Sequence, residues 1–433
     1  MMTSVGSSRE EEALALEHVA SAEQASKMPP GVDLSLAMPV ERIAIVGGGL
    51  MGAGIATACL RASLSVTLIE RDRDAAKEAA ERISGLLDGA VKRGKLTAEE
   101  KHERLTRLTA TASTQRAAPA DLAIEAVLED LAAKRLVFQK LTAVLGEDTP
   151  IATNTSYLDP LAIADGIGNP GRILGLHFFS PAHIMKLLEV VRTPHTSEET
   201  LATALALAGR LGKVAVLSGI CDGFIGNRML QAYRRQADYL LVDGCLPHEI
   251  DAAMRAFGMP MGPYELQDLT GLQISYANRQ RGAATRDPNE RYVDIGDQLC
   301  EVGRIGQRVG IGWYRYEKGD RTPRRDDEVE RLIAETSARS GITRRQFSED
   351  EVRAKLLAVL INEGGHILDE AIASRASDID LVKIHGYGFP RKLGGPMFYG
   401  EALGRKDVLA TMQMVAEQSP ESWRISHYLE ADR

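Results

Sequence analysis

The chain has 433 residues, a length typical of two or three domains, and 44% of them are hydrophobic and 26% charged, as in ordinary globular proteins. Its formal net charge of −8 gives no reason to expect a nucleic-acid partner, although a local positive site could still bind an anionic ligand. No apolar stretch is long enough to cross a bilayer and no signal-peptide pattern is present, so we expect a cytoplasmic protein without a membrane span. The four cysteines have neither metal-ligand nor redox spacing, so we expect no metal.

The first 38 residues begin polar and acidic. A helix-compatible run extends from about Glu10 to Lys27, and the sequence Met-Pro-Pro-Gly at residues 28–31 then breaks the pattern. We interpret residues 1–38 as an N-terminal helix and linker that lead into the first domain.

Short apolar runs that alternate with helix-compatible segments occupy residues 39–218. Such alternation is typical of a mainly parallel sheet with helices on both faces. The predicted strands are Ile43–Val46, Val66–Ile69, Leu122–Ala126, Ile151–Ala152, Ile173–Leu176, Leu187–Val191 and Val214–Leu217.

Strand patterns fade after about Ser218, and the remainder is predicted to be helical. Phe224 to Asp243 reads as one long helix, because its apolar residues recur near one face. We divide this part into a first helical domain (219–325), a linker (326–345) and a second helical domain (346–433).

An internal similarity supports two helical domains. Residues 244–251 (GCLPHEID) precede a Gly-Pro pair at 262–263, and residues 373–380 (ASRASDID) precede another at 395–396. A helical run with a similar apolar pattern lies before each. Two diverged copies of one helical unit would explain the similarity, although the resemblance is weak and chance remains an alternative.

A glycine-rich motif follows the first predicted strand. Residues 47–52 (GGGLMG) fit the pattern G-x-G-x-x-G, which is weak alone but here follows a strand and opens a helix. Gly47 would allow the tight turn, Gly49 the approach of a pyrophosphate, and Gly52 the packing of helix on strand. The backbone of Leu50 and Met51 at the helix N-terminus would face the phosphates. The alternative is a glycine turn without a ligand.

Glu70 ends the second predicted strand, 23 residues after Gly47. A carboxylate there would accept hydrogen bonds from the adenosine ribose and repel a 2′-phosphate, which favours NAD over NADP. Arg71 and Arg73 follow directly, and an arginine could instead bind a 2′-phosphate.

A histidine and a carboxylate lie on neighbouring apolar strands. His177 ends one predicted strand, and Glu189 lies inside the next, twelve residues later. A carboxylate in a buried strand needs a partner, because its desolvation is costly. A His–Glu pair suits the oxidation of an alcohol, in which imidazole takes the hydroxyl proton and the carboxylate orients it. From composition alone, a structural core histidine and a structural ion pair remain the simpler interpretations.

These motifs together resemble the L-3-hydroxyacyl-CoA dehydrogenase family, and more narrowly the dehydrogenase half of multifunctional fatty-acid β-oxidation enzymes. The resemblance covers about residues 40–433. It rests on VGGGLMGAGIA (46–56), TNTS (153–156), GLHFFSPAHIMKLLEVV (175–191), CDGFIGNRM (221–229), MPMGPYELQDLTGL (259–272), GWYRY (312–316) and ASDIDLVKIHGYGFP (376–390). It implies an α/β Rossmann-type NAD-binding domain followed by two related all-α domains.

The resemblance also implies roles for single residues. His177 would be the general base and Glu189 its partner, while Ser156 and Asn227 would bind the substrate oxygens and complete the catalytic group. Residues Asn154, Glu129 and Lys134 match positions at the cofactor. From the residues alone, Asn154 and Ser156 would be part of a polar turn, Asn227 a polar helix residue, and Glu129 and Lys134 solvated helix charges.

Three positions depart from the family pattern. Tyr157 stands where many relatives have a second serine, Ser180 where many have asparagine, and Arg308 where a lysine is frequent. None of them removes a predicted catalytic group, but Tyr157 lies beside Ser156 and could reshape the acyl pocket.

The activity that the resemblance implies is the NAD-dependent oxidation of (3S)-3-hydroxyacyl-CoA to 3-ketoacyl-CoA. The multifunctional relatives also carry an N-terminal hydratase domain, which the first 38 residues are too short to form, so we expect dehydrogenation without hydration. Association with a separate enoyl-CoA hydratase or thiolase is possible. The alternatives are a catalytically weak scaffold subunit of a β-oxidation complex and a dehydrogenase of a free hydroxy acid.

Overall fold

A computed structural model describes residues 8–431. Residues 1–7 of the predicted N-terminal extension and residues 432–433 of the predicted second helical domain lie outside the described residues. The chain forms two compact units. We call residues 16–228 with 370–387 the sheet unit, and residues 8–15, 229–369 and 388–431 the helical unit. The predicted five-part division along the chain stays a prediction.

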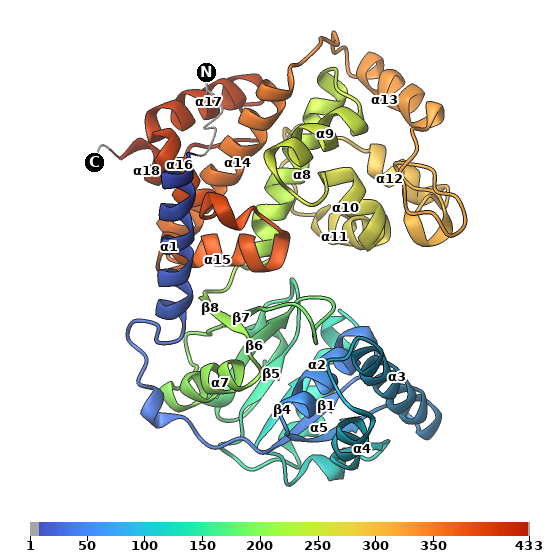
Figure 1. The fold of residues 1–433 in the computed structure, drawn as a ribbon, viewed down its shortest axis with the longest axis vertical. Helices are drawn as coiled ribbons and strands as arrows, with labels where there is room; N and C mark the ends of the chain where they lie inside the picture. The colour runs from blue at the N-terminus through green and yellow to red at the C-terminus, as the bar shows by residue number, and fades with distance from the viewer. Residues whose placement is uncertain (1–7, 432–433) are drawn as a thin grey trace. The chain divides into compact units, whose positions relative to one another are not determined.

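An eight-stranded sheet forms the centre of the sheet unit (Figure 1). Its order is β3-β2-β1-β4-β5-β6-β7-β8, with β7 antiparallel to β6 and every other neighbouring pair parallel. The strands are β1 (Arg42–Val46), β2 (Ser65–Ile69), β3 (Leu108–Thr111), β4 (Leu122–Glu125), β5 (Ile151–Thr153), β6 (Ile173–Phe178), β7 (Leu187–Val191) and β8 (Val214–Ser218). The mainly parallel sheet that the sequence predicts is therefore confirmed.

Helices cover both faces of this sheet, so its inner strands are buried on both sides (Figure 1). Apolar residues of α2, α3 and α7 pack on one face, including Ile55, Ile83 and Leu201. Residues of α5 and α6, including Phe138 and Ile163, pack on the other. The helices of this unit are α2 (Leu50–Arg61), α3 (Arg73–Lys92), α4 (Ala98–Thr106), α5 (Leu131–Thr142), α6 (Pro160–Ile163), α7 (Glu198–Arg210) and α15 (Ala376–Tyr387).

The helical unit is built from helices, and its described part contains no named strand. Two long helices, α1 (Arg9–Ser26) and α8 (Gly226–Asp243), each have residues in both units. The others are α9 (Pro247–Phe257), α10 (Pro263–Thr270), α11 (Leu272–Gly282), α12 (Ile295–Glu301), α13 (Asp327–Arg339), α14 (Glu349–Asp369), α16 (Pro396–Leu403), α17 (Arg405–Gln418) and α18 (His427–Glu430). Among residues 8–431, no helix is both long enough and apolar enough to cross a membrane.

The order of the helices reproduces the internal similarity of the sequence. The same three helices occur in the same order twice, as α8–α9–α10 and as α14–α15–α16. The first of each set is long, the second follows the Gly-Cys-Leu or Ala-Ser-Arg segment, and the third begins at the proline of Gly-Pro. In the first copy Asp251 accepts hydrogen bonds from the amides of Tyr264 and Glu265 at the start of α10. A Cβ on Gly262 would lie 2.1 Å from Asp251. In the first copy, Asp251 and the Gly-Pro pair thus form a helix-capping device.

Within the helical unit, the second copy packs on the first. Helix α14 contacts α9, Phe257 of α9 packs against Phe389 and Tyr399, and Tyr239 of α8 packs against Trp423. The segment 326–345, predicted as a linker, contains α13. Its residues Val329 and Ile333, four apart on one helical face, are buried.

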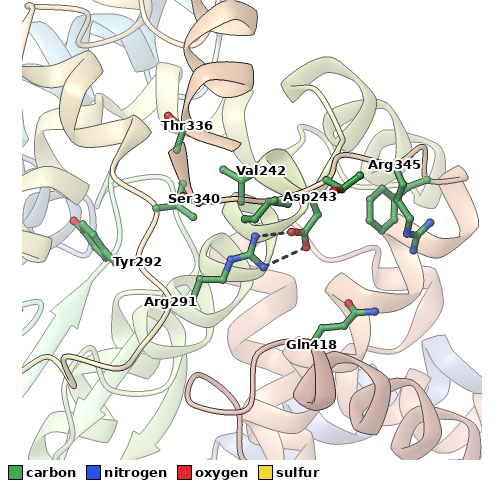
Figure 2. A pocket seen from close by; sticks show the side chains of 12 residues that line it. Val242, Asp243, Arg291, Tyr292, Thr336, Ser340, Arg345 and Gln418 are labelled. Carbon is green, nitrogen blue, oxygen red and sulfur yellow. Dashed lines mark hydrogen bonds and ion pairs between the residues drawn. The ribbon is translucent and has the colours of Figure 1, made fainter. Parts of the chain in front are cut away.

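A cavity of about 510 Å³ lies in the helical unit (Figure 2). Arg291 and Asp243 form an ion pair across it, with an N–O distance of 2.5 Å, and the Arg345 guanidinium lies over the Phe347 ring. None of the predicted site residues lines this cavity. Its central charges are already paired, so we assign it no function.

Candidate functional site

The predicted site residues gather at the carboxyl ends of strands in the sheet unit. Gly47 follows β1, Glu70 follows β2, Glu129 follows β4, Asn154 follows β5, and His177 lies near the end of β6. In open α/β sheets ligands bind outside the carboxyl ends of the strands. The topology therefore brings together residues that lie far apart in the sequence.

The glycine motif forms the turn that the sequence predicts. Gly47 has φ +98°, and a Cβ there would lie 2.6 Å from the Ala126 carbonyl oxygen. A Cβ on Gly52 would lie 1.8 Å from the Gly47 carbonyl oxygen, so the helix can approach the turn only with glycine. Beside Gly49, in contrast, a Cβ would meet nothing within 4 Å. Gly49 is the N-cap of α2, so the backbone at Leu50 and Met51 opens toward space that a pyrophosphate could fill.

A cavity of about 460 Å³ extends from this turn. Gly47, Gly49, Glu70 and Arg71 line it together with apolar side chains of β2, the β4–α5 loop and α5. Glu70 accepts a hydrogen bond of 2.6 Å from the Gly48 amide, while Arg82 donates one to the Gly48 carbonyl. The cavity, its glycine floor and its carboxylate fit the adenosine part of a dinucleotide.

Glu129 organises the turn that carries Ser156. Its Oε1 accepts hydrogen bonds from the Thr155 hydroxyl and from the amides of Ser156 and Tyr157, at 2.6, 2.8 and 3.0 Å. Burial raises the pKa of Glu129, but Lys134 and these hydrogen bonds outweigh it, so the pKa lies below its usual value. Glu129 is therefore held as a carboxylate beside the predicted substrate site.

Lys134 is buried rather than solvated. Its side chain is 1% exposed, and its Nζ lies 2.9 Å from Glu125 and 3.2 Å from Glu129. The ammonium thus forms ion pairs with both carboxylates and helps to hold Glu129 in place. Its predicted contact with the cofactor, like those of Glu129 and Asn154, stays a prediction. Asn154 is buried, and its Oδ1 accepts a hydrogen bond from the Phe178 amide.

His177 and Glu189 face each other across the antiparallel pair β6–β7. Nδ1 of His177 lies 2.6 Å from Oε2 of Glu189, and both side chains are buried, Glu189 completely. The other oxygen of Glu189, Oε1, accepts a hydrogen bond of 2.8 Å from the Gly226 amide at the start of α8. A helix N-terminus and an imidazole therefore both offset the cost of burying this carboxylate.

The pair fixes which imidazole nitrogen is available. Because Nδ1 is bound to Glu189, Nε2 is the nitrogen that can accept a proton from a bound hydroxyl. Phe179 packs on the imidazole at a ring-centroid distance of 4.5 Å and Phe224 at 5.7 Å. These two tilted rings confine the imidazole, which is buried.

Asn227 and Ser156 lie beside each other. Nδ2 of Asn227 is 3.5 Å from the carbonyl oxygen of Ser156, and both residues are half-buried. Two contacts of the group were missed by sequence reasoning. Gly226 lies in the motif CDGFIGNRM next to Asn227, but nothing in the pattern shows that its amide binds Glu189. Tyr387, whose hydroxyl contacts Asn227, comes from a distant segment.

Comparison with known proteins decides the family. Residues 42–221 match the family described as 3-hydroxyacyl-CoA dehydrogenase, NAD binding domain, and residues 223–316 match its C-terminal domain. The chain is 30% identical to the crystal structure of (S)-3-hydroxybutyryl-CoA dehydrogenase PaaH1 from Ralstonia eutropha, with a TM-score of 0.59, over 65% of this chain and 100% of that one. The chain belongs to the 3-hydroxyacyl-CoA dehydrogenase family. NAD is therefore its cofactor, and the predicted fold class is confirmed.

Two further comparisons extend over almost the whole chain. The structure of the dehydrogenase part of multifunctional enzyme 1 from C. elegans is 26% identical, with a TM-score of 0.68, and the match covers 98% of this chain and 96% of that one. The peroxisomal bifunctional enzyme of Danio rerio is 38% identical over 408 residues, 91% of this chain and 56% of that protein. This dehydrogenase chain thus spans about half the length of the curated relatives that it matches.

Proposed function

We propose that this dehydrogenase oxidises the 3-hydroxyl of (3S)-3-hydroxyacyl-CoA to a ketone, with His177 as the general base. The observation that carries the proposal is the buried pair of His177 and Glu189 at 2.6 Å, at the same edge of the sheet as the glycine turn. The family match supports the substrate class. The remaining sequence-predicted site residues fit around this pair.

Each residue has one task in this proposal. Nε2 of His177 accepts the proton of the substrate hydroxyl as the C3–H bond breaks and C3 becomes a carbonyl carbon. Glu189 holds the imidazole by Nδ1 and offsets the positive charge that forms on it. Ser156 and Asn227 donate hydrogen bonds to the substrate oxygens. NAD, when bound, supplies the acceptor for the hydride that leaves C3.

The turn at Gly47, Gly49 and Gly52, with the backbone of Leu50 and Met51, would hold the pyrophosphate of NAD. Glu70 would bind the adenosine ribose, provided that its carboxylate exchanges the Gly48 amide for the ribose hydroxyls or shares it with them. Asn154, Glu129 and Lys134 would support the nicotinamide end, with Lys134 acting through Glu129. Arg71 lines the same cavity, which keeps NADP as the alternative to test.

The experiment is a kinetic panel with the purified chain. NADH formation should be measured with (3S)-3-hydroxybutyryl-CoA, with longer 3-hydroxyacyl-CoA thioesters, and with free 3-hydroxybutyrate, each with NAD and with NADP. Turnover of the thioesters with NAD and not of the free acid supports the proposal. Turnover of the free acid alone supports the hydroxy-acid alternative, and no turnover at all supports the scaffold alternative.

Partners and location belong to the same proposal. Because the curated relatives are named bifunctional or multifunctional and are about twice as long, we propose association with a separate enoyl-CoA hydratase or thiolase. Co-purification of either activity with a tagged chain tests this. The cytoplasmic location stays a prediction, since these relatives are named as peroxisomal proteins, and imaging of the tagged chain in its host tests it.

We also propose the division of labour along the chain that the sequence predicts. Residues 39–218 bind NAD, residues 219–325 and 346–433 are the two helical domains, and residues 1–38 and 326–345 connect them. Limited proteolysis followed by mass spectrometry tests these limits, because cleavage should concentrate in exposed loops between the domains and not in the packed helices α1 and α13.

A further inference from the structure

Tyr387, the last residue of α15, touches the predicted catalytic group from outside the part of the chain that the family models match. Those matches end at residue 316. The Tyr387 side chain is half-buried, and its hydroxyl lies 2.8 Å from Oδ1 of Asn227. Both residues belong to the sheet unit.

The Tyr387 contact adds a second restraint to the way the Asn227 amide faces. A carboxamide has an acceptor and a donor that a rotation of 180° interchanges. The neighbour of Asn227 on one side is the carbonyl oxygen of Ser156, at 3.5 Å, and a carbonyl oxygen can only accept. The amide atom on that side is therefore Nδ2, and Oδ1 on the other side accepts from the Tyr387 hydroxyl.

The Tyr387 ring has little freedom to move. Its ring packs edge-on against Phe179, which in turn packs on His177, and Nζ of Lys383 lies 4.1 Å from the ring centroid. A Cβ on Gly226 would lie 2.5 Å from the ring. The neighbouring Gly386 is similarly confined, because a Cβ added there would lie 2.6 Å from the Leu187 side chain on β7.

We propose that Tyr387 is a positioning residue, which holds Nδ2 of Asn227 toward the substrate oxygen. This inference rests on the role of Asn227 in the proposed function. Without the hydroxyl, only the 3.5 Å contact with the Ser156 carbonyl oxygen restrains the amide. The amide then more often rotates and places the lone pairs of Oδ1 against the substrate oxygen, which weakens binding in the transition state.

The proposal gives the second helical copy a part in the reaction through Asn227. Helix α15 belongs to that copy by sequence, yet it packs on β7 and β8 in the sheet unit. Helix α15 lies beside α1 (Figure 1). Two histidine–carboxylate contacts, His18 with Asp380 and His385 with Glu23, join the two helices. Tyr387 is thus carried by a helix that is anchored on two sides.

The test is Tyr387→Phe, which removes the hydroxyl and keeps the ring. With NAD and (3S)-3-hydroxybutyryl-CoA we expect kcat/KM to fall about tenfold, the effect of one lost hydrogen bond in the transition state. NAD affinity and melting temperature should stay at the wild-type values. Tyr399→Phe is the matched control, because Tyr399 lies in the second copy but in the helical unit, and it should keep full activity.

A double-mutant cycle separates positioning from a merely structural role. If Tyr387 acts through Asn227, Tyr387→Phe should cost nothing more in an Asn227→Ala background. A full additional loss in that background would overturn the proposal, as would a Tyr387→Phe chain with wild-type kcat/KM or one that no longer binds NAD. A wild-type chain that forms no NADH overturns the proposed function as well, whereas an active wild type beside an unaffected Tyr387→Phe overturns only the role of Tyr387.

Discussion

The Gly226 amide donates a hydrogen bond to Oε1 of Glu189, the oxygen that does not contact His177. One carboxylate thus joins the imidazole on β6 to the N-terminus of α8, which also carries Asn227. The proposed general base and the predicted substrate-binding amide are therefore held by one buried group. Because Glu189 is fully buried, loss of either partner would leave part of its charge uncompensated.

Gly226→Ala should damage this junction. The new Cβ would lie 2.5 Å from the Tyr387 ring, so either the ring or the start of α8 must shift. We expect kcat to fall on the order of tenfold or more, since small displacements of a catalytic group are costly. Gly209→Ala in α7 is the control, because its Cβ would meet nothing within 4 Å. Alanine there should raise the stability by about 0.5–1 kcal/mol and leave the kinetics unchanged.

Glu189→Gln tests the partner of the base. Glutamine keeps the shape but has one acceptor oxygen where Glu189 uses two, and it cannot offset the charge of an imidazolium. We expect kcat to fall by roughly 10²-fold or more, with a folded protein. If melting temperature alone changes while kcat is retained, Glu189 has only a structural role.

The sequence predicts much of the sheet unit because its strands are buried on both faces and therefore read as apolar runs. All seven predicted strands are present, and α1 begins and ends within one residue of the predicted run Glu10–Lys27. The strand β3 was not predicted. It lies at the sheet edge, its four residues are partly exposed, and its sequence, Leu-Thr-Ala-Thr, has no apolar run.

The same limit applies to the site. His177 and Glu189 could be paired from sequence, since both lie in neighbouring apolar strands. Lys134 could not be recognised as buried, because its helix α5 carries other charges and only the fold places it behind Glu129. The contact of Tyr387 with Asn227 could not be predicted from the sequence, because a contact between residues 160 positions apart leaves no local pattern.

Glu70 should determine the choice of cofactor. Glu70→Gln removes the charge that would repel a 2′-phosphate, so the preference for NAD over NADP should narrow on the order of tenfold. The affinity for both cofactors should be compared by titration. Glu78→Gln, an exposed charge on α3, controls for the change in net charge. A wild-type chain that already uses NADP better would contradict this role and make Arg71 the residue to test.

Truncation tests the second helical copy. Deleting every residue after Ala338 removes the aromatic partners of Phe257 and Tyr239, together with α15. The exposed apolar surface should cause aggregation, dimerisation or loss of activity. The intact chain should not need to dimerise through that covered surface, which size-exclusion chromatography at the assay concentration can check. A soluble, monomeric and fully active truncation would show that the second copy is needed neither to cover apolar surface of the first copy nor for activity.

The most direct measurement is the kcat of His177→Gln for NADH formation with (3S)-3-hydroxybutyryl-CoA. We predict a decrease by roughly 10²- to 10⁴-fold, the usual contribution of a positioned general base, with unchanged affinity for NAD. The exposed residue His195 supplies the matched control, His195→Gln, which should keep the wild-type rate. A His177→Gln chain that retains most of its activity would contradict the assignment of His177 as the base.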